Sequence, residues 1–161
     1  TILTMALGDA LAVALMERRD FKPEDFKVLH PGGNLGLQML TVSQLMRNKT
    51  EMAIVKDDLT MSAIVACMTK SGFGVAILVD ENGILSGIIT DGDLRRNIND
   101  ILSLSPRDIA TLNPTSVQPT DLVSVALEKM EKSKVYAIVV IEDEKPIGLL
   151  RMHDVLRTGI K

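Results

Sequence analysis

The chain has 161 residues, enough for one domain or two small ones with a hydrophobic core. Its composition, 46% hydrophobic and 24% charged, is typical of a globular protein and excludes a disordered one. A net charge of −3 and an aromatic content of 2% argue against a nucleic-acid partner, because such a surface needs basic patches and base-stacking rings.

The apolar segments and the cysteine content predict a cytoplasmic protein without a membrane partner. The longest apolar runs, such as VYAIVVI at 135–141, are too short to cross a bilayer. The apolar stretch at 5–16 carries Asp9 and has no basic leader, so it is not interpreted as a signal peptide. Cys67 is the single cysteine, which excludes an internal disulfide, and we expect it to be a buried, inert thiol.

Residues 4–19 are predicted to form one helix, because alanine and leucine dominate the stretch and Thr4 can cap it. Its apolar residues cover almost every face, and such a helix is normally buried within a larger body. The chain also starts at Thr1 rather than at methionine. We therefore expect a fragment whose partner domain lies upstream, and a helix that shields its apolar faces against a symmetry mate or the following repeats.

A long internal repeat follows a linker or functional loop at 21–36. Residues 55–96 align with residues 117–157 in pattern, although few residues are identical. Each copy is predicted to contain a short strand, a helix, an apolar strand, a second strand and a short closing helix. The predicted positions are strands at 52–55 and 115–117, helices at 59–71 and 121–133, and apolar strands at 74–79 and 135–141.

Neither repeat is expected to be stable alone. A copy of roughly sixty residues buries too little surface on folding, and the continuous apolar runs indicate strands that are covered on both sides. We therefore expect an α/β (α+β) fold in which two β-α-β-β-α copies, at 42–101 and 105–161, pack face to face about a pseudo-twofold axis.

Both copies end in the same kind of strand-to-helix corner. The first corner lies in GIITDGDLRR at 87–96 and the second in GLLRMHDVLR at 148–157. In the first corner, Thr90 and Asp93 have the spacing of a capping box, which contributes about 1 kcal/mol and needs no ligand. The same residues suit a nucleotide, because a hydroxyl can bind phosphate and a carboxylate can accept from two ribose hydroxyls. Both interpretations stay open, because a ligand can bind to the same residues that cap the helix.

The second corner departs from the first. Arg151 replaces the threonine, whereas Asp154 is kept. Arg151 either contacts a phosphate or leaves its corner without a ligand. We expect His153 to be a solvated residue at the start of the helix. Arg95, Arg96 and Arg157 are expected to be surface charges, and the alternative is that one of them neutralises a phosphate.

The tandem β-α-β-β-α repeat, ending in G-h-h-T-x-x-D, resembles a cystathionine-β-synthase (CBS) domain pair over about residues 42–158. Such pairs are typically regulatory, and many bind adenosine or other nucleotides in clefts between the repeats. The resemblance implies that Thr90 and Asp93 contact ribose and phosphate. Asp154 would be the equivalent residue in a second cleft, which Arg151 weakens.

The N-terminal part resembles a second family. The stretch LGDALAVALMERRDFKPEDFKVLHPGGNLG at 7–36 is similar to the end of the sugar-isomerase (SIS) domain of bacterial D-arabinose-5-phosphate isomerases. In that family GDALA lies on the last SIS helix, and HPGG precedes a CBS pair whose first repeat also carries TDGDLRR. Residues 1–36 are accordingly assigned to the remnant of an SIS domain and its linker.

This second resemblance implies an aldose–ketose isomerase that interconverts ribulose 5-phosphate and arabinose 5-phosphate. The product feeds the synthesis of Kdo, the eight-carbon sugar acid of lipopolysaccharide. His30 in HPGG is implied to be an active-site residue, and an imidazole can exchange protons at neutral pH. Without the resemblance, His30 is interpreted as a solvent-facing linker residue. The base and the phosphate-binding residues would lie upstream, so the fragment itself is expected to be inactive.

Two functions are compared. In the first, the pair binds a nucleotide or CMP-sugar (CMP-Kdo, AMP or ATP) near Thr90 and Asp93 and regulates its own SIS domain. In the second, the clefts are empty and the pair only arranges isomerase subunits into a homo-oligomer, which Arg151 supports. The sequence contains no metal-spaced cluster, P-loop or nucleophile elbow, so we expect no metal and no required cofactor.

Overall fold

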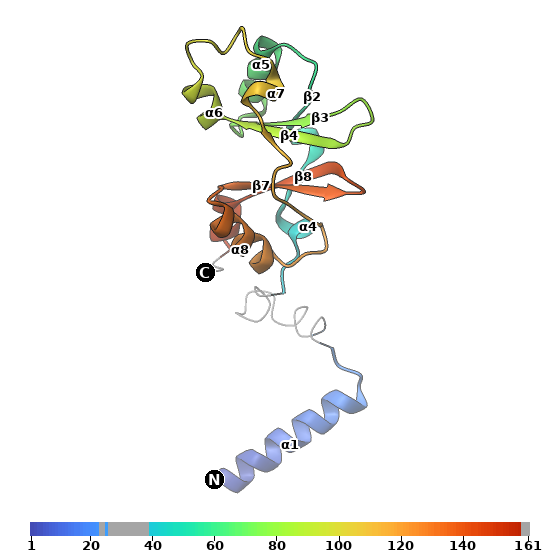
Figure 1. Cartoon of the computed structure of the whole chain (residues 1–161). Helices are drawn as coiled ribbons and strands as arrows, with labels where there is room; N and C mark the ends of the chain where they lie inside the picture. Colours follow the sequence, from blue (N-terminus) through green and yellow to red (C-terminus); the bar gives the residue numbers. More distant parts are fainter. Residues whose placement is uncertain (23–24, 26–38, 159–161) are drawn as a thin grey trace. The chain divides into compact units, whose positions relative to one another are not determined.

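The structure, a computed structural model, describes residues 1–22, 25 and 39–158 (Figure 1). The chain divides into two compact units, Thr1–Met39 and Leu40–Lys161. His30 lies outside the described residues, so its expected role in an active site stays a prediction.

Helix α1, Ile2–Arg18, belongs to the N-terminal unit and confirms the predicted helix. It begins earlier than expected, and Thr1 rather than Thr4 is the residue at its N-cap. α1 buries none of its side chains, and its leucines and methionines are exposed. The expected packing of α1 against a symmetry mate or the following repeats therefore stays a prediction. In the described part of the chain, no helix is both long and apolar enough to span a membrane.

The first of two four-stranded sheets is built mostly from the first repeat. Its order is β2-β3-β4-β5, with β2 at Ala53–Lys56, β3 at Val75–Val79, β4 at Leu85–Thr90 and β5 at Thr111–Leu112. β2 runs parallel to β3, whereas β4 is antiparallel to both of its neighbours. Every residue of β3 is buried, as expected for a strand that is covered on both faces.

The second sheet repeats this arrangement with the second repeat. Its order is β1-β8-β7-β6, with β1 at Arg47–Asn48, β8 at Lys145–Arg151, β7 at Ala137–Glu142 and β6 at Ser116–Val117. β6 runs parallel to β7, and β8 is antiparallel to both of its neighbours. The internal repeat predicted from the sequence is therefore a structural repeat.

Each repeat carries one longer helix, a short closing helix and short opening segments. The helices are α5 at Met61–Ser71, α6 at Asp91–Arg96, α8 at Val123–Ser133, α9 at Met152–Leu156, α4 at Val42–Leu45, η1 at Lys49–Glu51 and α7 at Pro106–Ile109. α5 begins at Met61 rather than at 59 because Thr60 caps it, accepting from the Ala63 N–H. At its end, Gly72 has a φ of 70°, a left-handed conformation that favours glycine and ends the helix.

The two repeats exchange their opening segments. β1, which follows α4, pairs with β8 of the second sheet, while β5, which follows α7, pairs with β4 of the first. Arg107 in α7 also donates from Nη2 to Asp57 Oδ2, just after β2, at 2.7 Å. The sequence ranges 42–101 and 105–161 therefore interlock in space, which a reading of local periodicity does not predict.

A hydrophobic cluster joins the two sheets. Its buried members are Val75, Ile77 and Ile88 from the first sheet and Val139 and Leu149 from the second. In Figure 1 the strands β3 and β4 accordingly lie over β7 and β8. The two halves thus pack face to face, as predicted.

A second hydrophobic cluster lies between α5 and the first sheet. Cys67 borders this cluster and is a free cysteine that is only half-buried. Cys67 is therefore less buried than predicted. The reason is its place on α5, where Ile64 and Met68 form the buried stripe and Cys67 lies at the stripe's edge.

We expect Gly148→Ala to weaken the pairing of β1 with β8. A Cβ at Gly148 would lie 2.6 Å from Met46 Sδ and 3.0 Å from the Arg47 carbonyl oxygen, so the strand edge must shift. The free energy of unfolding, measured in urea, should fall by about 1–2 kcal/mol. Gly8→Ala is the control, because its Cβ meets no atom within 4 Å. An equal loss in both variants would contradict the prediction.

Candidate functional site

A cavity of about 950 Å³ lies within the unit Leu40–Lys161. Both corners contribute to its wall: Thr90 and Asp93 come from the first, and Arg151 and His153 from the second. We refer to this cavity as the shared cleft. Ligand pockets have volumes of roughly 300–1,000 Å³, so the shared cleft is large enough for a nucleotide.

Two aromatic side chains also line the shared cleft. Phe73 lies under the Arg151 guanidinium, whose central carbon is 4.7 Å from the ring centroid. Tyr136 is 80% exposed. Neither residue was predicted from the sequence, although Tyr136 directly precedes β7, and only Gly74 separates Phe73 from β3. They give the cleft flat surfaces on which a base or another planar group can stack.

The first corner is a capping box around an almost buried carboxylate. The Thr90 backbone N–H and the Thr90 hydroxyl donate to Asp93 Oδ2 at 2.8 Å and 2.7 Å. The Asp93 N–H donates to Thr90 Oγ1 at 3.4 Å. Asp93 is 6% exposed, and its other oxygen, Oδ1, accepts from Arg96, whose side chain is 70% exposed. The capping interpretation is confirmed, and the adjoining cavity keeps the nucleotide interpretation open.

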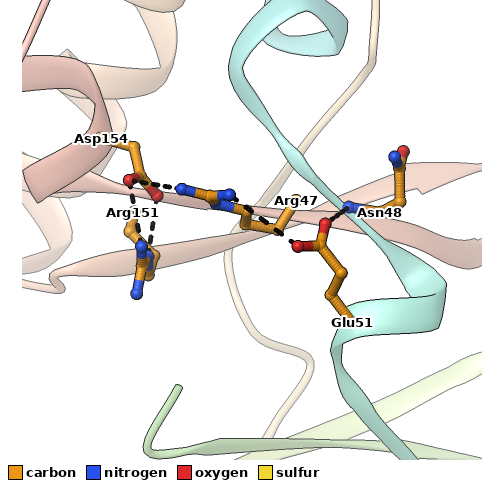
Figure 2. Close-up of polar contacts among 5 residues, drawn as sticks. All are labelled: Arg47, Asn48, Glu51, Arg151 and Asp154. Carbon is orange, nitrogen blue, oxygen red and sulfur yellow. Dashed lines mark hydrogen bonds and ion pairs between the residues drawn. The ribbon is translucent and has the colours of Figure 1, made fainter. Parts of the chain in front are cut away.

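In the second corner, two arginines surround the carboxylate (Figure 2). Arg151 donates from Nε to Asp154 Oδ2 at 2.8 Å and from Nη2 to Oδ1 at 3.0 Å. Arg47 in β1 donates from Nη2 to Asp154 Oδ1 at 3.3 Å, and its Nη1 lies 3.8 Å from Glu51. Both oxygens of Asp154 are thus engaged within the chain. A sugar could reach this carboxylate only by displacing an arginine.

The arginines also change the acidity of this carboxyl group. The hydrogen bonds from Arg151 lower the pKa of Asp154 from 3.8 to about 2, because they stabilise the charged form. Burial acts in the opposite direction, and Arg47 adds a further lowering. Asp154 therefore carries its negative charge at every physiological pH and holds both arginines in place.

We expect Asp154→Asn to reduce the sensitivity of the fold to acid. A carboxylate with a lowered pKa stabilises the fold above its unfolded pKa, and this contribution of about 2 kcal/mol disappears as the pH falls from 3.8 toward about 2. Urea unfolding at neutral pH and at acidic pH values measures the difference between wild type and variant. The variant keeps Asp57 and Asp108, whose pKa values are lowered by hydrogen bonds from Arg107 and Ser105. It should therefore still lose some stability in acid. An equally steep loss in both proteins would contradict the prediction.

The strand pairings make the two corners equivalent. β5 pairs with β4 in the same way that β1 pairs with β8. Thr111 of the first sheet and Arg47 of the second sheet therefore occupy equivalent positions. Thr90 and Arg151 correspond in the same way, each ending the strand before the closing helix. The first corner thus has two threonines where the second has two arginines. The carboxylate of the first corner lines the shared cleft, whereas that of the second corner does not.

The remaining residues singled out in the sequence lie on the surface. His153 is exposed at the start of α9, as predicted, and it also lines the shared cleft. Arg95, Arg96 and Arg157 are exposed, as predicted. Arg95 and Arg96 line the cleft, whereas Arg157 is not among its lining residues. Within residues 1–22, 25 and 39–158, no group of three His, Cys, Asp or Glu side chains is placed to hold a metal ion.

The profile of the CBS domain family matches residues 42–100 and 107–160. The chain belongs to the CBS domain family. The two sheets, the closing helices and the two corners are therefore the parts of a CBS pair, and the fold class predicted from the repeat is confirmed.

The whole chain is similar to arabinose 5-phosphate isomerase KdsD from Pseudomonas aeruginosa. The two are 39% identical over 165 residues, which cover 99% of this chain and 51% of the relative. The chain thus spans about half the length of that enzyme. The likeness includes the N-terminal unit as well as the CBS pair.

Solved CBS pairs resemble this one in fold. The CBS domain pair of protein MJ0100, in complex with 5′-methylthioadenosine and S-adenosyl-L-methionine, has a TM-score of 0.68 at 20% identity and covers 74% of this chain and 94% of its own. The CBS domain protein PAE2072 from Pyrobaculum aerophilum, complexed with AMP, has a TM-score of 0.65 at 23% identity and covers 71% and 89%. At this level of identity the likeness shows the fold alone.

Proposed function

We propose that this CBS pair is the regulatory, nucleotide-sensing part of a D-arabinose-5-phosphate isomerase. The likeness to KdsD over nearly the whole chain supports the parent enzyme. The stretches GDALA and HPGG in the N-terminal part support the same assignment. Residues 1–36 would then be the end of the SIS domain and a linker, followed by CBS repeats at 42–101 and 105–161.

The parent enzyme would interconvert D-ribulose 5-phosphate and D-arabinose 5-phosphate in the cytoplasm, for the synthesis of Kdo and lipopolysaccharide. His30 would take part in the proton transfer between adjacent carbons, since an imidazole both gives and takes protons near neutral pH. The base and the phosphate-binding groups would lie outside this chain. The chain alone should therefore show no isomerase activity, and measurable conversion of arabinose 5-phosphate by it would contradict the assignment.

The regulatory ligand would bind in the shared cleft beside Thr90 and Asp93. The observation that supports this site is the almost buried Asp93 carboxylate next to a cavity of nucleotide size. Its Oδ1 is engaged by an exposed arginine, Arg96, which can swing into solvent and leave that oxygen to a sugar hydroxyl. The AMP and adenosine derivatives in the similar CBS pairs support a nucleotide. CMP-Kdo, AMP and ATP are the candidates, and the binding of CMP-Kdo would give feedback from a later product.

Calorimetric titration of the chain with CMP-Kdo, CMP, AMP and ATP tests this site. At least one of them should bind, and Thr90→Ala should weaken it about tenfold through the loss of one hydrogen bond to a charged group. Thr69→Ala is the matched control, because its hydroxyl donates to the Val65 carbonyl within α5, away from the cleft. If no compound gives heat or shifts the melting temperature, the sensing function is wrong.

A second candidate function is supported by the second corner. Arg47 and Arg151 already occupy the Asp154 carboxylate there, as expected for a module that binds no ligand and only assembles isomerase subunits. Deleting residues 42–161 from a full-length enzyme distinguishes the two functions. A change in oligomeric mass alone favours the structural module, whereas a lost response to CMP-Kdo or AMP favours regulation.

A further inference from the structure

Arg151 belongs to the second corner and also lines the shared cleft. Its Nε and Nη2 hold Asp154 in the second corner. The same side chain lines the shared cleft together with Thr90 and Asp93 of the first corner. Arg151 therefore brings a positive charge from the second repeat to the wall of a cavity that Asp93 of the first repeat also lines.

Three contacts fix the position of this guanidinium. Asp154 accepts two hydrogen bonds in the paired geometry that suits a carboxylate, and the Phe73 ring supports the planar group at 4.7 Å. The side chain is 28% exposed. Its third nitrogen, Nη1, makes no hydrogen bond within the described residues. A held guanidinium with free N–H donors is prepared to bind an anion, because little side-chain entropy is lost on binding.

Asp154, by contrast, has no free oxygen for a ligand. Oδ2 accepts from Arg151, and Oδ1 accepts from both Arg151 and Arg47. Asp154 also does not appear in the wall of the shared cleft, whereas its counterpart Asp93 does. The carboxylate of the second corner thus serves the arginine rather than a sugar.

We infer that Arg151 is the anion-binding residue of the shared cleft, that Asp154 is its positioning residue, and that the second corner takes no ligand of its own. The inference rests on the proposed function. The ligand is a ribonucleotide whose sugar lies at Asp93 and whose phosphate, or another acidic group, reaches Arg151. Each chain therefore binds one nucleotide and prefers it to the uncharged nucleoside.

Calorimetry on the full chain with AMP against adenosine, and with CMP against cytidine, tests this arrangement. Wild type should bind one nucleotide per chain and prefer it to its nucleoside by about tenfold or more, the range of a hydrogen bond to a charged group. Arg151→Gln should remove most of that preference. Asp154→Asn keeps the arginine but releases it, so an intermediate preference is expected. Arg157→Gln removes an exposed arginine that does not line the cleft, and it should keep the full preference.

A measurement on the unsubstituted chain keeps the inference testable where a variant does not fold. The Nε–Hε resonance of Arg151 should shift when AMP or CMP is added and stay in place with adenosine or cytidine. Absence of binding by any of the four compounds overturns the proposed function and the inference with it. Binding with an unmoved Arg151 resonance, with two nucleotides per chain, or with an unchanged preference in Arg151→Gln overturns the inference alone.

Discussion

Leu149→Ala should destabilise both CBS repeats together, by about 2–5 kcal/mol. Leu149 in β8 is 1% exposed, and it packs with Val75, Ile77 and Ile88 of the other sheet. Truncation removes buried apolar surface and leaves a cavity at the contact between the sheets. Because neither repeat buries enough surface alone, loosening this contact should lower the stability of both.

Urea unfolding and hydrogen exchange measure the two parts of this expectation. The unfolding curve should keep a single transition and move to lower urea concentration. Amides of β3 and of β7 should lose protection by similar factors. Leu102→Ala is the control, because Leu102 is 75% exposed. Loss of protection confined to the second repeat would show that the sheets do not unfold as one unit.

The sequence predicted the elements of each repeat because their patterns are local. Continuous apolar runs at 74–79 and 135–141 marked the buried central strands, now β3 and β7. The two longer helices followed from helical spacing, with errors of two residues at their starts. The repeat also predicted that the two halves pack together, since two similar copies that are too small to be stable alone must cover each other's apolar surface.

The exchange of opening segments between the two repeats could not be predicted from local sequence patterns. β1 and β5 are strands of two residues each, too short to show any periodicity. Their partners are far away in sequence, as in the pairing of Arg47 with Leu149. A long-range pairing of this kind is decided by tertiary packing, and a single sequence carries no signal for it.

Only the part of the candidate site that depends on a local motif was predicted from the sequence. The spacing of Thr90 and Asp93 identified the first corner, because a capping box is a local motif. Asp154 was predicted as a ligand contact by analogy with Asp93. The structure shows Asp154 engaged by Arg151 and by Arg47, a residue 107 positions away, and its predicted contact with a ligand stays a prediction. The replacement of the threonine by Arg151 was visible in the sequence, whereas the contact with Arg47 is shown only by the three-dimensional structure.

This asymmetry has a consequence for the two candidate functions. The almost buried carboxylate of the first corner, Asp93, lines the shared cleft, whereas Asp154 of the second corner does not. Ion pairs engage both carboxylates, but the Arg96 side chain that pairs with Asp93 is 70% exposed, whereas the Arg151 side chain that pairs with Asp154 is 28% exposed. The proposed ligand site therefore depends on the first corner, and nucleotide binding there distinguishes the regulatory function from the structural one.

Asp93→Asn should lower the affinity of the chain for AMP by about tenfold to a hundredfold, and it should also reduce discrimination against 2′-deoxy-AMP. A carboxylate accepts hydrogen bonds from both ribose hydroxyls, whereas an amide offers one oxygen. The deoxy compound has already lost one of those hydroxyls. The variant should therefore lose more affinity for AMP than for the deoxy compound, and calorimetry on the four combinations gives the coupling directly.

The control for Asp93→Asn must separate binding from folding. Asparagine keeps the shape of Asp93 and one acceptor for the Thr90 N–H, so the melting temperature should fall only modestly. Asp100→Asn removes an exposed carboxylate of the same charge outside the cleft wall and should leave both affinities unchanged. If wild type and Asp93→Asn discriminate equally against 2′-deoxy-AMP, the sugar does not bind at Asp93, and the cap has a structural role only.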